Sequence, residues 1–425
     1  MTIRKEQKIK GKKCHDSEMT RDELKKELFE RYGISMWPEE KIERFRKAVL
    51  DWFDANGREH LPWRQNKDPY RIWVSEIMLQ QTRVITVIPY FNRFMTLFPN
   101  ISDLASAPEE ALLKAWEGLG YYSRVRNLQT AAQQILTDYD GVFPNDPEEI
   151  IKLKGIGPYT AGAISSMAFN LPEPAVDGNI MRVFSRLFEI SDDIAKPATR
   201  KLFELLIRVV IDPNRPGDFN QAIMDLGTDI CGPVNPRPEE SPIKEFNASY
   251  QNGTMSQFPF KSKAKRPVPM EIQGLVIQKG NSFLLEKRPE NGLLANFWTF
   301  PMIEKDFSNL DVYEQLNFLI AEDQIELDKK PPLLKDVLYE TVLEDYKMNP
   351  ATVQPNISSV NHVFSHRKWN ISLHHVTIKK DIELNDLPPT MRWVNEKDFP
   401  TYAFAVPQQK MVQAFRKVKS KESNK

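Results

Sequence analysis

The sequence predicts a multidomain protein in which an all-α domain is followed by a smaller α+β domain. From Pro38 to about Phe246, apolar residues recur at helical intervals, and prolines divide the region into helices of modest length. From Glu271 onwards, the apolar period falls to two, as expected for strands. The length of 425 residues leaves room for two or three domains.

The composition excludes several classes of protein. The 41% hydrophobic and 27% charged residues are typical of a soluble globular chain. No apolar run approaches the ~20 residues that a bilayer span needs, and the lysine-rich N-terminus lacks the apolar segment of a secretion signal. The two cysteines argue against a disulfide scaffold and fit a reducing compartment. We therefore expect a cytoplasmic monomer without membrane contact.

The predicted segments follow from composition and periodicity. Residues 1–36 are polar and are expected to be disordered, with at most a short helix between Arg21 and Tyr32. The stretch "KIERFRKAVLDWF" has an amphipathic helical pattern, and "SAPEEALLKAWEGLG" begins with a helix start signal. The net charge of zero means that any nucleic-acid-binding surface must be local. The expected order is an extension, a helical domain, a linker, an α+β domain and a charged tail, over 1–36, 37–248, 249–269, 270–417 and 418–425.

The α+β domain is expected to begin with a hairpin. The stretch "EIQGLVIQKGNSFLLEKR" predicts two strands joined by a turn at Gly280-Asn281. A helix is expected around 311–322, and further strands near 334–345, 359–364 and 370–379.

The stretch "LPWRQNKDPYRIWVSEIMLQQTRV" contains a candidate general acid. Glu76 has apolar neighbours on both sides in a predicted helix, and a carboxyl that loses hydration has a raised pKa. Such a group keeps its proton near neutral pH and can deliver it to a substrate. The alternative is that Glu76 simply pairs with Arg64 or Arg83.

Two further stretches carry chemistry. In "LKGIGPYTAGAI", backbone N–H groups near Gly155 and Gly157 can face a phosphate; the alternative is a tight turn between two helices. In "PAVDGNIMRVFSRLF", Asp177 precedes a predicted helix and could merely cap it. It could also place a carboxylate opposite Glu76, as cleavage of a glycosidic bond requires.

These stretches, together with "LKAWEGLGYYSRVRNL" and "FNQAIMDLG", resemble the helix-hairpin-helix DNA glycosylases, and within them the MutY-type adenine DNA glycosylases. The resemblance implies an enzyme that removes adenine mispaired with 8-oxoguanine, and also opposite guanine, from double-stranded DNA. It implies that Glu76 protonates the adenine, that Asp177 stabilises the sugar, and that Tyr159 and Asn179 hold these groups in place. The implied adenine pocket is Leu61, Trp63, Arg64 and Gln221, and the implied DNA and lesion contacts are Gln81, Thr82, Tyr121, Gly155 and Gly157.

Two departures from related families shape the expected chemistry. Tyr159 stands where related glycosylase/lyases have a Schiff-base lysine, which implies base removal without strand cleavage. The family's iron–sulfur loop has four cysteines spaced C-x6-C-x2-C-x5-C, but here only Cys231 matches. Pro238, Ser241 and Asn247 occupy the other positions, so a degenerate loop over 231–247 without a cluster, and no metal or other cofactor, is expected.

The C-terminal stretches "GLVIQKGNSFLLEKRPENGLLANFWTFP" and "NHVFSHRKWNI" resemble the Nudix-like domain with which this family recognises 8-oxoguanine. The resemblance implies that Phe364, Ser365 and His366 read the lesion. The acids within 311–326 lack the arrangement of a catalytic Nudix box, so hydrolysis is not expected there.

Two alternatives remain open at this level. One is an endonuclease III-like glycosylase/lyase for oxidised pyrimidines, against which Tyr159 and the C-terminal domain argue. The other is a non-catalytic lesion-binding protein, against which the presence of both Glu76 and Asp177 argues.

Overall fold

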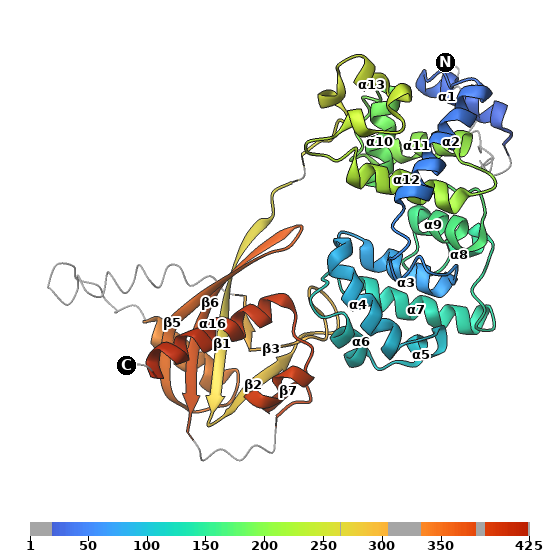
Figure 1. Cartoon of the computed structure of the whole chain (residues 1–425). Helices are drawn as coiled ribbons and strands as arrows, with labels where there is room; N and C mark the ends of the chain where they lie inside the picture. Colours follow the sequence, from blue (N-terminus) through green and yellow to red (C-terminus); the bar gives the residue numbers. More distant parts are fainter. Residues whose placement is uncertain (1–18, 264, 305–332, 380–386, 424–425) are drawn as a thin grey trace, which may run out of the picture. The chain divides into compact units, whose positions relative to one another are not determined.

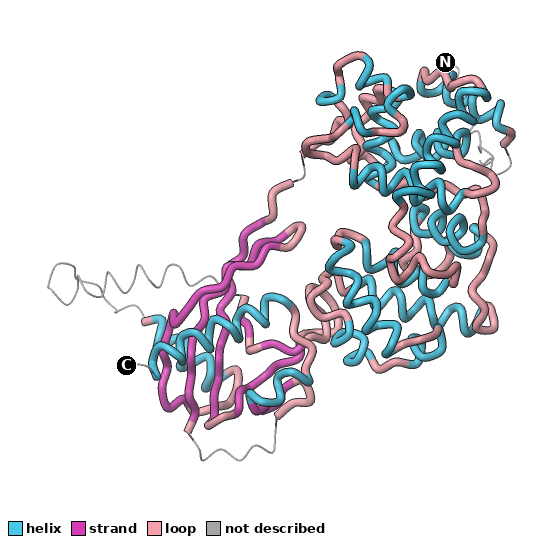
Figure 2. The backbone as a smooth tube through the Cα atoms, viewed as in Figure 1, coloured by secondary structure: helices cyan, strands magenta, loops and turns pink. Residues whose placement is uncertain are grey.

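The computed structural model describes residues 19–263, 265–304, 333–379 and 387–423. Contacts divide the chain into two compact units, which are described separately. The helical unit comprises Met1–Ser106 and Asn127–Lys263, and the sheet unit comprises Ala107–Arg126 and Ala264–Lys425. The two kinds of secondary structure are distinguished by colour in Figure 2. The predicted fold class, an all-α domain followed by an α+β domain, is confirmed.

The described part of the helical unit contains helices and no strand (Figure 1). Its first helices are α1 (Arg21–Tyr32), α2 (Glu39–Asn56), α3 (Pro69–Leu79), α4 (Val84–Leu97) and α5 (Ile101–Ser106). Next come α7 (Ser123–Asp138), whose first turn belongs to the sheet unit, α8 (Pro147–Ile150), α9 (Pro158–Phe169) and α10 (Gly178–Phe188). The last are α11 (Pro197–Val210), α12 (Pro216–Asp229), the short α13 (Ala248–Gln251) and three 3-10 turns, η1 (Pro238–Glu240), η2 (Lys244–Phe246) and η3 (Met255–Gln257).

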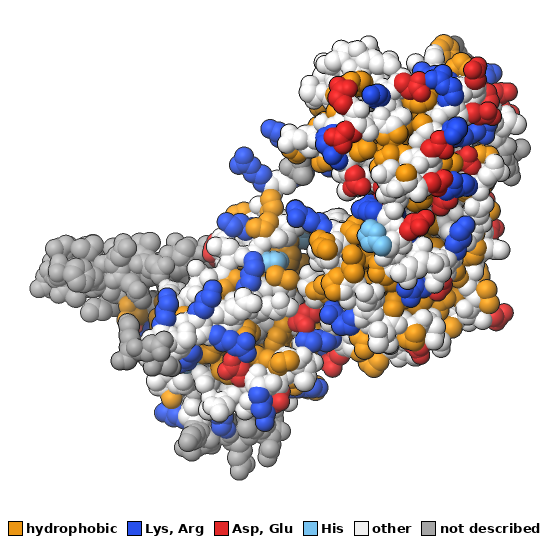
Figure 3. All heavy atoms as spheres, viewed as in Figure 1, with side chains coloured by type: hydrophobic (Ala, Val, Ile, Leu, Met, Phe, Trp, Pro, Cys, Tyr) orange, Lys and Arg blue, Asp and Glu red, His pale blue; other side chains and the backbone are white. Residues whose placement is uncertain are grey.

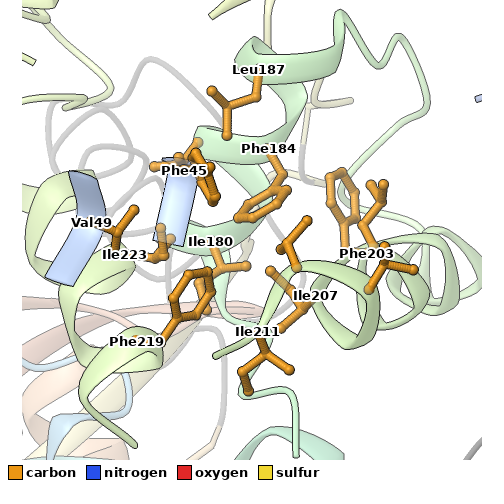
Figure 4. Close-up of a cluster of buried hydrophobic side chains, with 14 of the residues drawn as sticks. Phe45, Val49, Ile180, Phe184, Leu187, Phe203, Ile207, Ile211, Phe219 and Ile223 are labelled. Atoms are coloured by element: carbon orange, nitrogen blue, oxygen red, sulfur yellow. The ribbon is translucent and has the colours of Figure 1, made fainter. Parts of the chain in front are cut away.

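One hydrophobic core joins α2, α10, α11 and α12. Figure 4 shows Phe45, Phe184, Phe203 and Phe219 in this cluster, and all four are fully buried. This core fixes the start of α10, which carries Asp177 at its N-cap.

The N-terminal extension is helical where the sequence allowed a short helix, although most of it was expected to be disordered. Residues 21–32 form α1, whose capping box joins Thr20 and Glu23. Leu24 and Leu28 are buried in the same core as α2. Burial of two leucines four residues apart explains why a helix forms in a segment of polar composition. Residues 1–18 lie outside the described residues.

The sheet unit is built on a seven-stranded sheet in which β3, β2, β1, β6 and β5 are neighbours in that order, with β4 paired to β1 and β7 paired to β2. Strands β1 and β6 are parallel, and the other pairs are antiparallel. The strands are β1 (Val268–Lys279), β2 (Ser282–Lys287), β3 (Trp298–Thr299), β4 (Met302–Ile303), β5 (Pro350–Val363), β6 (Arg367–Ile378) and β7 (Met391–Asn395). The described helices are α6 (Glu109–Ala115), α15 (Leu334–Glu344), η4 (Glu396–Thr401) and α16 (Val406–Ser423).

The predicted hairpin at Gly280-Asn281 is confirmed, since Lys279 pairs with Ser282 across the turn. The strands expected at 359–364 and 370–379 correspond to β5 and β6, although β5 begins earlier. The helix expected around 311–322 lies outside the described residues.

One expectation for the sheet unit is wrong. The strand expected over 334–345 is the helix α15, because Leu334, Leu338 and Val342 follow a helical spacing and bury one face. The tail expected over 418–425 continues α16 as far as Ser423.

Residues 107–126, which follow the helical pattern of the first domain in sequence, pack with the sheet unit. The Glu117 carboxylate accepts hydrogen bonds from the Phe404 N–H at 2.9 Å and from Gln409 Nε2 at 3.1 Å. The Tyr122 ring lies 4.3 Å from the Phe297 ring. The expected linker is also partly anchored, because the Ile194 N–H donates to the Phe260 carbonyl oxygen within the helical unit.

In the described part of the chain, every helix is too short or too polar to cross a membrane.

Candidate active site

A cleft of about 1240 Å³ in the helical unit is lined by every predicted site residue that the structure places in that unit, whereas Tyr121, expected in the helical domain, belongs to the sheet unit. The four proposed catalytic residues, Glu76, Tyr159, Asp177 and Asn179, come from α3, α9 and the start of α10. The expected base pocket contributes Leu61, Trp63, Arg64 and Gln221. The expected DNA contacts contribute Gln81, Thr82, Gly155 and Gly157. The fold therefore gathers segments that are far apart in the sequence around one concave surface.

Glu76 is a buried carboxyl in the wall of this cleft. Its side chain lies on α3, the residue is 5% exposed, and Tyr159 Oη donates a hydrogen bond to its Oε2 at 2.5 Å. The pKa of Glu76 is raised to about 7, mainly by burial and to a smaller extent by the negative charge of Asp177, against the opposing effects of the hydrogen bond from Tyr159 and the charge of Arg64. Glu76 therefore holds a proton at neutral pH in a substantial fraction of molecules.

Asp177 is both a helix cap and a cleft residue. Its Oδ1 accepts from the Ile180 N–H at 2.7 Å, and its Oδ2 accepts from Asn179 Nδ2 at 2.7 Å. Burial raises the pKa of Asp177, whereas these two hydrogen bonds favour the charged form. The capping alternative is thus compatible with the catalytic one.

Arg182, in the first turns of α10, holds the side chain of Asn179 through a hydrogen bond. Its Nη2 donates to Asn179 Oδ1 at 2.8 Å, and its Nε donates to the Cys231 carbonyl oxygen at 2.8 Å. Gly227 lets the helices approach, because a Cβ there would lie 2.8 Å from the Asn179 Cβ. The sequence reasoning missed Arg182, although it stands one helical turn after Gly178 in the quoted motif.

The alternative pairing of Glu76 with Arg64 is not what the structure shows. Arg64 instead pairs with Asp225 on α12, with Nη1 2.7 Å from Oδ2. Arg58 also pairs with Asp225. The sequence reasoning missed both Asp225 and Arg58. The signal for Asp225 was a lone acid in the otherwise apolar run "AIMDLG".

The expected base pocket has an apolar floor. Leu61 and Trp63 are buried, and the Trp63 ring packs edge-on against Phe91 at 5.4 Å. Gln221 faces the cleft from α12, with Nε2 donating to the Gly217 carbonyl oxygen at 3.3 Å. Such a mixture of flat apolar surface and a few polar groups suits a planar base.

The hairpin at 153–158 ends in a helix N-terminus. Gly155 has φ +79°, a conformation that favours glycine, and α9 begins directly after its N-cap Gly157. Gln81 also has a positive φ of 59° in the loop after α3, where its side chain is exposed. Both segments present polar groups at the rim of the cleft.

The remaining predicted residues belong to the sheet unit and are placed within it. Tyr121 is 48% exposed with φ 48°, and the Arg124 guanidinium lies over its ring at 5.7 Å. Phe364 packs edge-on against Trp369 at 4.9 Å, at the turn between β5 and β6. Ser365 and His366 are exposed in this turn, with Ser365 Oγ 3.4 Å from His366 Nδ1.

Two other histidines of the sheet unit, His374 and His375, have hydrogen-bond partners within it. His374 Nδ1 accepts from the Asn356 N–H at 3.0 Å, and His375 lies between Gln354 and Gln278. Burial lowers the pKa of His374 and of His375 to about 4, so both rings are neutral. Among the described residues, no group of three or more His, Cys, Asp or Glu side chains is arranged to hold a metal ion.

The degenerate loop at 231–247 does not fit a cluster of four thiolates. Cys231 is a free cysteine whose Sγ accepts from Arg186 Nη1 at 3.1 Å. Ser241 Oγ accepts from the Ile243 N–H, and Asn247 is the N-cap of α13. With Pro238 at the remaining position, three of the four side chains lack a thiol, and protein hydrogen bonds hold the loop.

Comparison with known proteins assigns the helical unit to a superfamily of base excision DNA repair proteins. Residues 74–208 match the model of the HhH-GPD superfamily base excision DNA repair proteins, and residues 273–414 match a NUDIX domain. A solved thermostable thymine-DNA glycosylase is 26% identical, with a TM-score of 0.46, over 50% of this chain and 98% of that chain.

The relatives specify the family. Adenine DNA glycosylase of Buchnera aphidicola (strain Bp) is 38% identical over 296 residues, which cover 69% of this chain and 84% of the relative. The Homo sapiens adenine DNA glycosylase is 31% identical over 88% of this chain and 74% of the relative. That of Arabidopsis thaliana is 39% identical over 63% of this chain, and the match spans about half of the relative's length, 49%. The chain belongs to the adenine DNA glycosylase family.

Proposed function

We propose that this chain removes adenine paired with 8-oxoguanine, and also with guanine, from duplex DNA without cutting the strand. The observation that carries the proposal is the buried Glu76, which keeps its proton in a substantial fraction of molecules near neutral pH and lines the same cleft as Asp177. A neutral acid and an ionised carboxylate facing one nucleotide are what cleavage through an oxocarbenium-like state requires.

In the proposed reaction, the adenine leaves the base stack and enters the pocket at Leu61 and Trp63. Glu76 delivers its proton to a ring nitrogen of the adenine, which becomes a neutral leaving group. The electron pair of the N-glycosidic bond departs with the base. Asp177 stabilises the positive sugar carbon, or bonds to it. Water then adds its oxygen to that carbon, displaces the aspartate oxygen if it has bonded, and gives up a proton to the Glu76 carboxylate.

Tyr159 and Asn179 position these two carboxyl groups through the hydrogen bonds described above. Because Tyr159 offers no amine, a Schiff base at this point of the hairpin cannot form. We therefore propose base removal alone. The endonuclease III-like alternative predicts a nicked strand instead.

The lesion is proposed to be read by Ser365 in the turn between β5 and β6. The oxidised base has an N7–H donor that guanine lacks, and an exposed hydroxyl oxygen can accept from it. Phe364 and His366 flank this hydroxyl.

On the face shown in Figure 3, acidic and basic side chains are interspersed over the helical unit, so DNA contact is expected to depend on local groups such as the 153–158 hairpin.

We propose that the chain holds no iron–sulfur cluster, because Cys231 is the one thiol among the four expected ligand positions and Arg186 donates to its Sγ and to the carbonyl oxygens of Cys231 and Gly232. Iron and sulfide analysis of the purified protein is expected to give far less than one cluster per chain. Stoichiometric iron with sulfide would contradict this proposal.

The function is tested with a duplex that holds one adenine:8-oxoguanine pair. Product that appears only after alkali supports the proposal, direct nicking supports the lyase, and binding without product supports a non-catalytic protein. Glu76→Gln is expected to bind the duplex and lose excision by at least roughly 10²-fold. Glu43→Gln makes the same change at an exposed position of α2 and is expected to keep full activity.

A further inference from the structure

A buried carboxylate in the wall of the cleft is not used by the steps above. The Asp225 side chain is 0% exposed, and it accepts hydrogen bonds from two arginines. Arg64 binds in a bidentate manner, with Nη1 2.7 Å from Oδ2 and Nη2 3.0 Å from Oδ1. Arg58 Nε donates to Oδ1 at 3.1 Å. All three residues line the cleft that contains Glu76.

The charges around Glu76 come from several elements. Tyr159 faces it from α9, Asp177 from the start of α10, and Arg64 from the loop before α3. The cleft is also lined by the charged residues Arg58, Lys67, Arg83, Arg200, Asp218 and Asp225. The positive charge of Arg64 lowers the pKa of Glu76. The guanidinium of Arg64 is itself paired with the carboxylate of Asp225.

We propose that Asp225 is a positioning residue that holds Arg58 and Arg64 against the wall of the cleft and thereby prevents their charge from ionising Glu76. The proposal rests on the proposed role of Glu76 as the acid. A guanidinium whose buried partner is removed is an uncompensated charge, and a nearby carboxyl is then driven to its ionised form. Asp225 would thus keep the acid protonated without contacting substrate.

The first test is the pH dependence of the single-turnover rate of adenine excision. Asp225→Asn keeps the size of the side chain and removes the charge. The alkaline limb of its profile is expected at a pH lower by about one unit, because an opposite charge shifts a carboxyl by that order. Near pH 8 the excision rate of Asp225→Asn is expected to be about tenfold lower than that of the unsubstituted protein (the parent), whereas near pH 5 the two rates differ little.

A second variant is expected to shift the alkaline limb of the pH profile in the opposite direction. Arg58→Gln leaves Asp225 with Arg64 as its partner and adds negative character to the wall of the cleft. Its alkaline limb is expected at higher pH than that of the parent. Asp225→Glu retains the charge and is expected to keep the limb within a few tenths of a unit.

The proposal is overturned if Asp225→Asn lowers the rate by the same factor at every pH, or if Asp225→Asn and Arg58→Gln move the limb in the same direction. A role of Asp225 in folding alone gives the first of these results. If circular dichroism shows Asp225→Asn to be unfolded, Arg58→Gln decides, since an unmoved limb or a shift to lower pH overturns the proposal.

A direct titration separates this inference from the proposed function. The side-chain carboxyl of Glu76 is followed by carbon-13 NMR, and its resonance is identified by its loss in Glu76→Gln. Opposite shifts of this titration in Asp225→Asn and Arg58→Gln support the inference even if no adenine is excised. Excision with an unmoved titration supports the function and overturns the inference.

Discussion

Replacing Glu76 with glutamine is expected to stabilise the helical unit, and the gain depends on pH. The glutamate pKa rises from 4.5 to about 7 on folding because the side chain is buried beside Asp177. Between these values the unfolded chain has released the proton that the folded chain still holds. Stability therefore falls as pH rises through this window and is constant above it.

The magnitude follows from the pKa change. One pKa unit corresponds to about 1.4 kcal/mol, so the destabilisation from Glu76 reaches roughly 3 kcal/mol above pH 7. Glutamine is uncharged and can still accept the hydrogen bond from Tyr159. The free energy of unfolding of Glu76→Gln should equal that of the parent near pH 4.5 and exceed it by about 3 kcal/mol at pH 8.

The measurement is urea unfolding of the full chain at a series of pH values, with the helical unit followed by hydrogen exchange of peptides from α9. Glu43→Gln, on the exposed face of α2, is the matched control for the glutamate-to-glutamine change itself. A constant difference for Glu76→Gln between pH 4.5 and 8, or a loss of stability at pH 8, would refute the account of a buried neutral acid.

Three further outcomes are expected. Tyr159→Phe removes a hydrogen bond that favours the charged acid, so the alkaline limb of the excision profile should move to higher pH while the rate falls. Gly162→Ala places a Cβ 2.0 Å from a backbone oxygen and should lower the free energy of unfolding by about 3 kcal/mol. Gly157→Ala, with no atom within 4 Å of the new Cβ, should cost much less in urea unfolding, because it changes only the N-cap residue of α9. Arg186→Met removes the 3.1 Å contacts that hold the loop at 231–247, so hydrogen exchange there should quicken with no change in iron content; unchanged exchange would contradict the role of this arginine.

The sequence was informative about elements whose signal is local. Helical periodicity identified α2, and a strand pattern with a Gly-Asn turn identified β1 and β2. The segment 334–345 was misassigned, because a short apolar pattern does not reveal by itself which face the fold will bury. For α1, burial of Leu24 and Leu28 against a core formed far away in the sequence outweighed a polar composition.

The sequence by itself determined which groups are available for chemistry: an acid in an apolar helix, a carboxylate before a helix, and a tyrosine where a lysine would form a Schiff base. Tertiary structure alone decided which of these groups are protonated and which are paired. Glu76 becomes a neutral acid because distant segments bury it beside Asp177, and Arg64 pairs with Asp225 because α12 packs close to the loop before α3. Hydration and charge neighbours set a pKa, and both depend on atoms brought together through space, which no local pattern records.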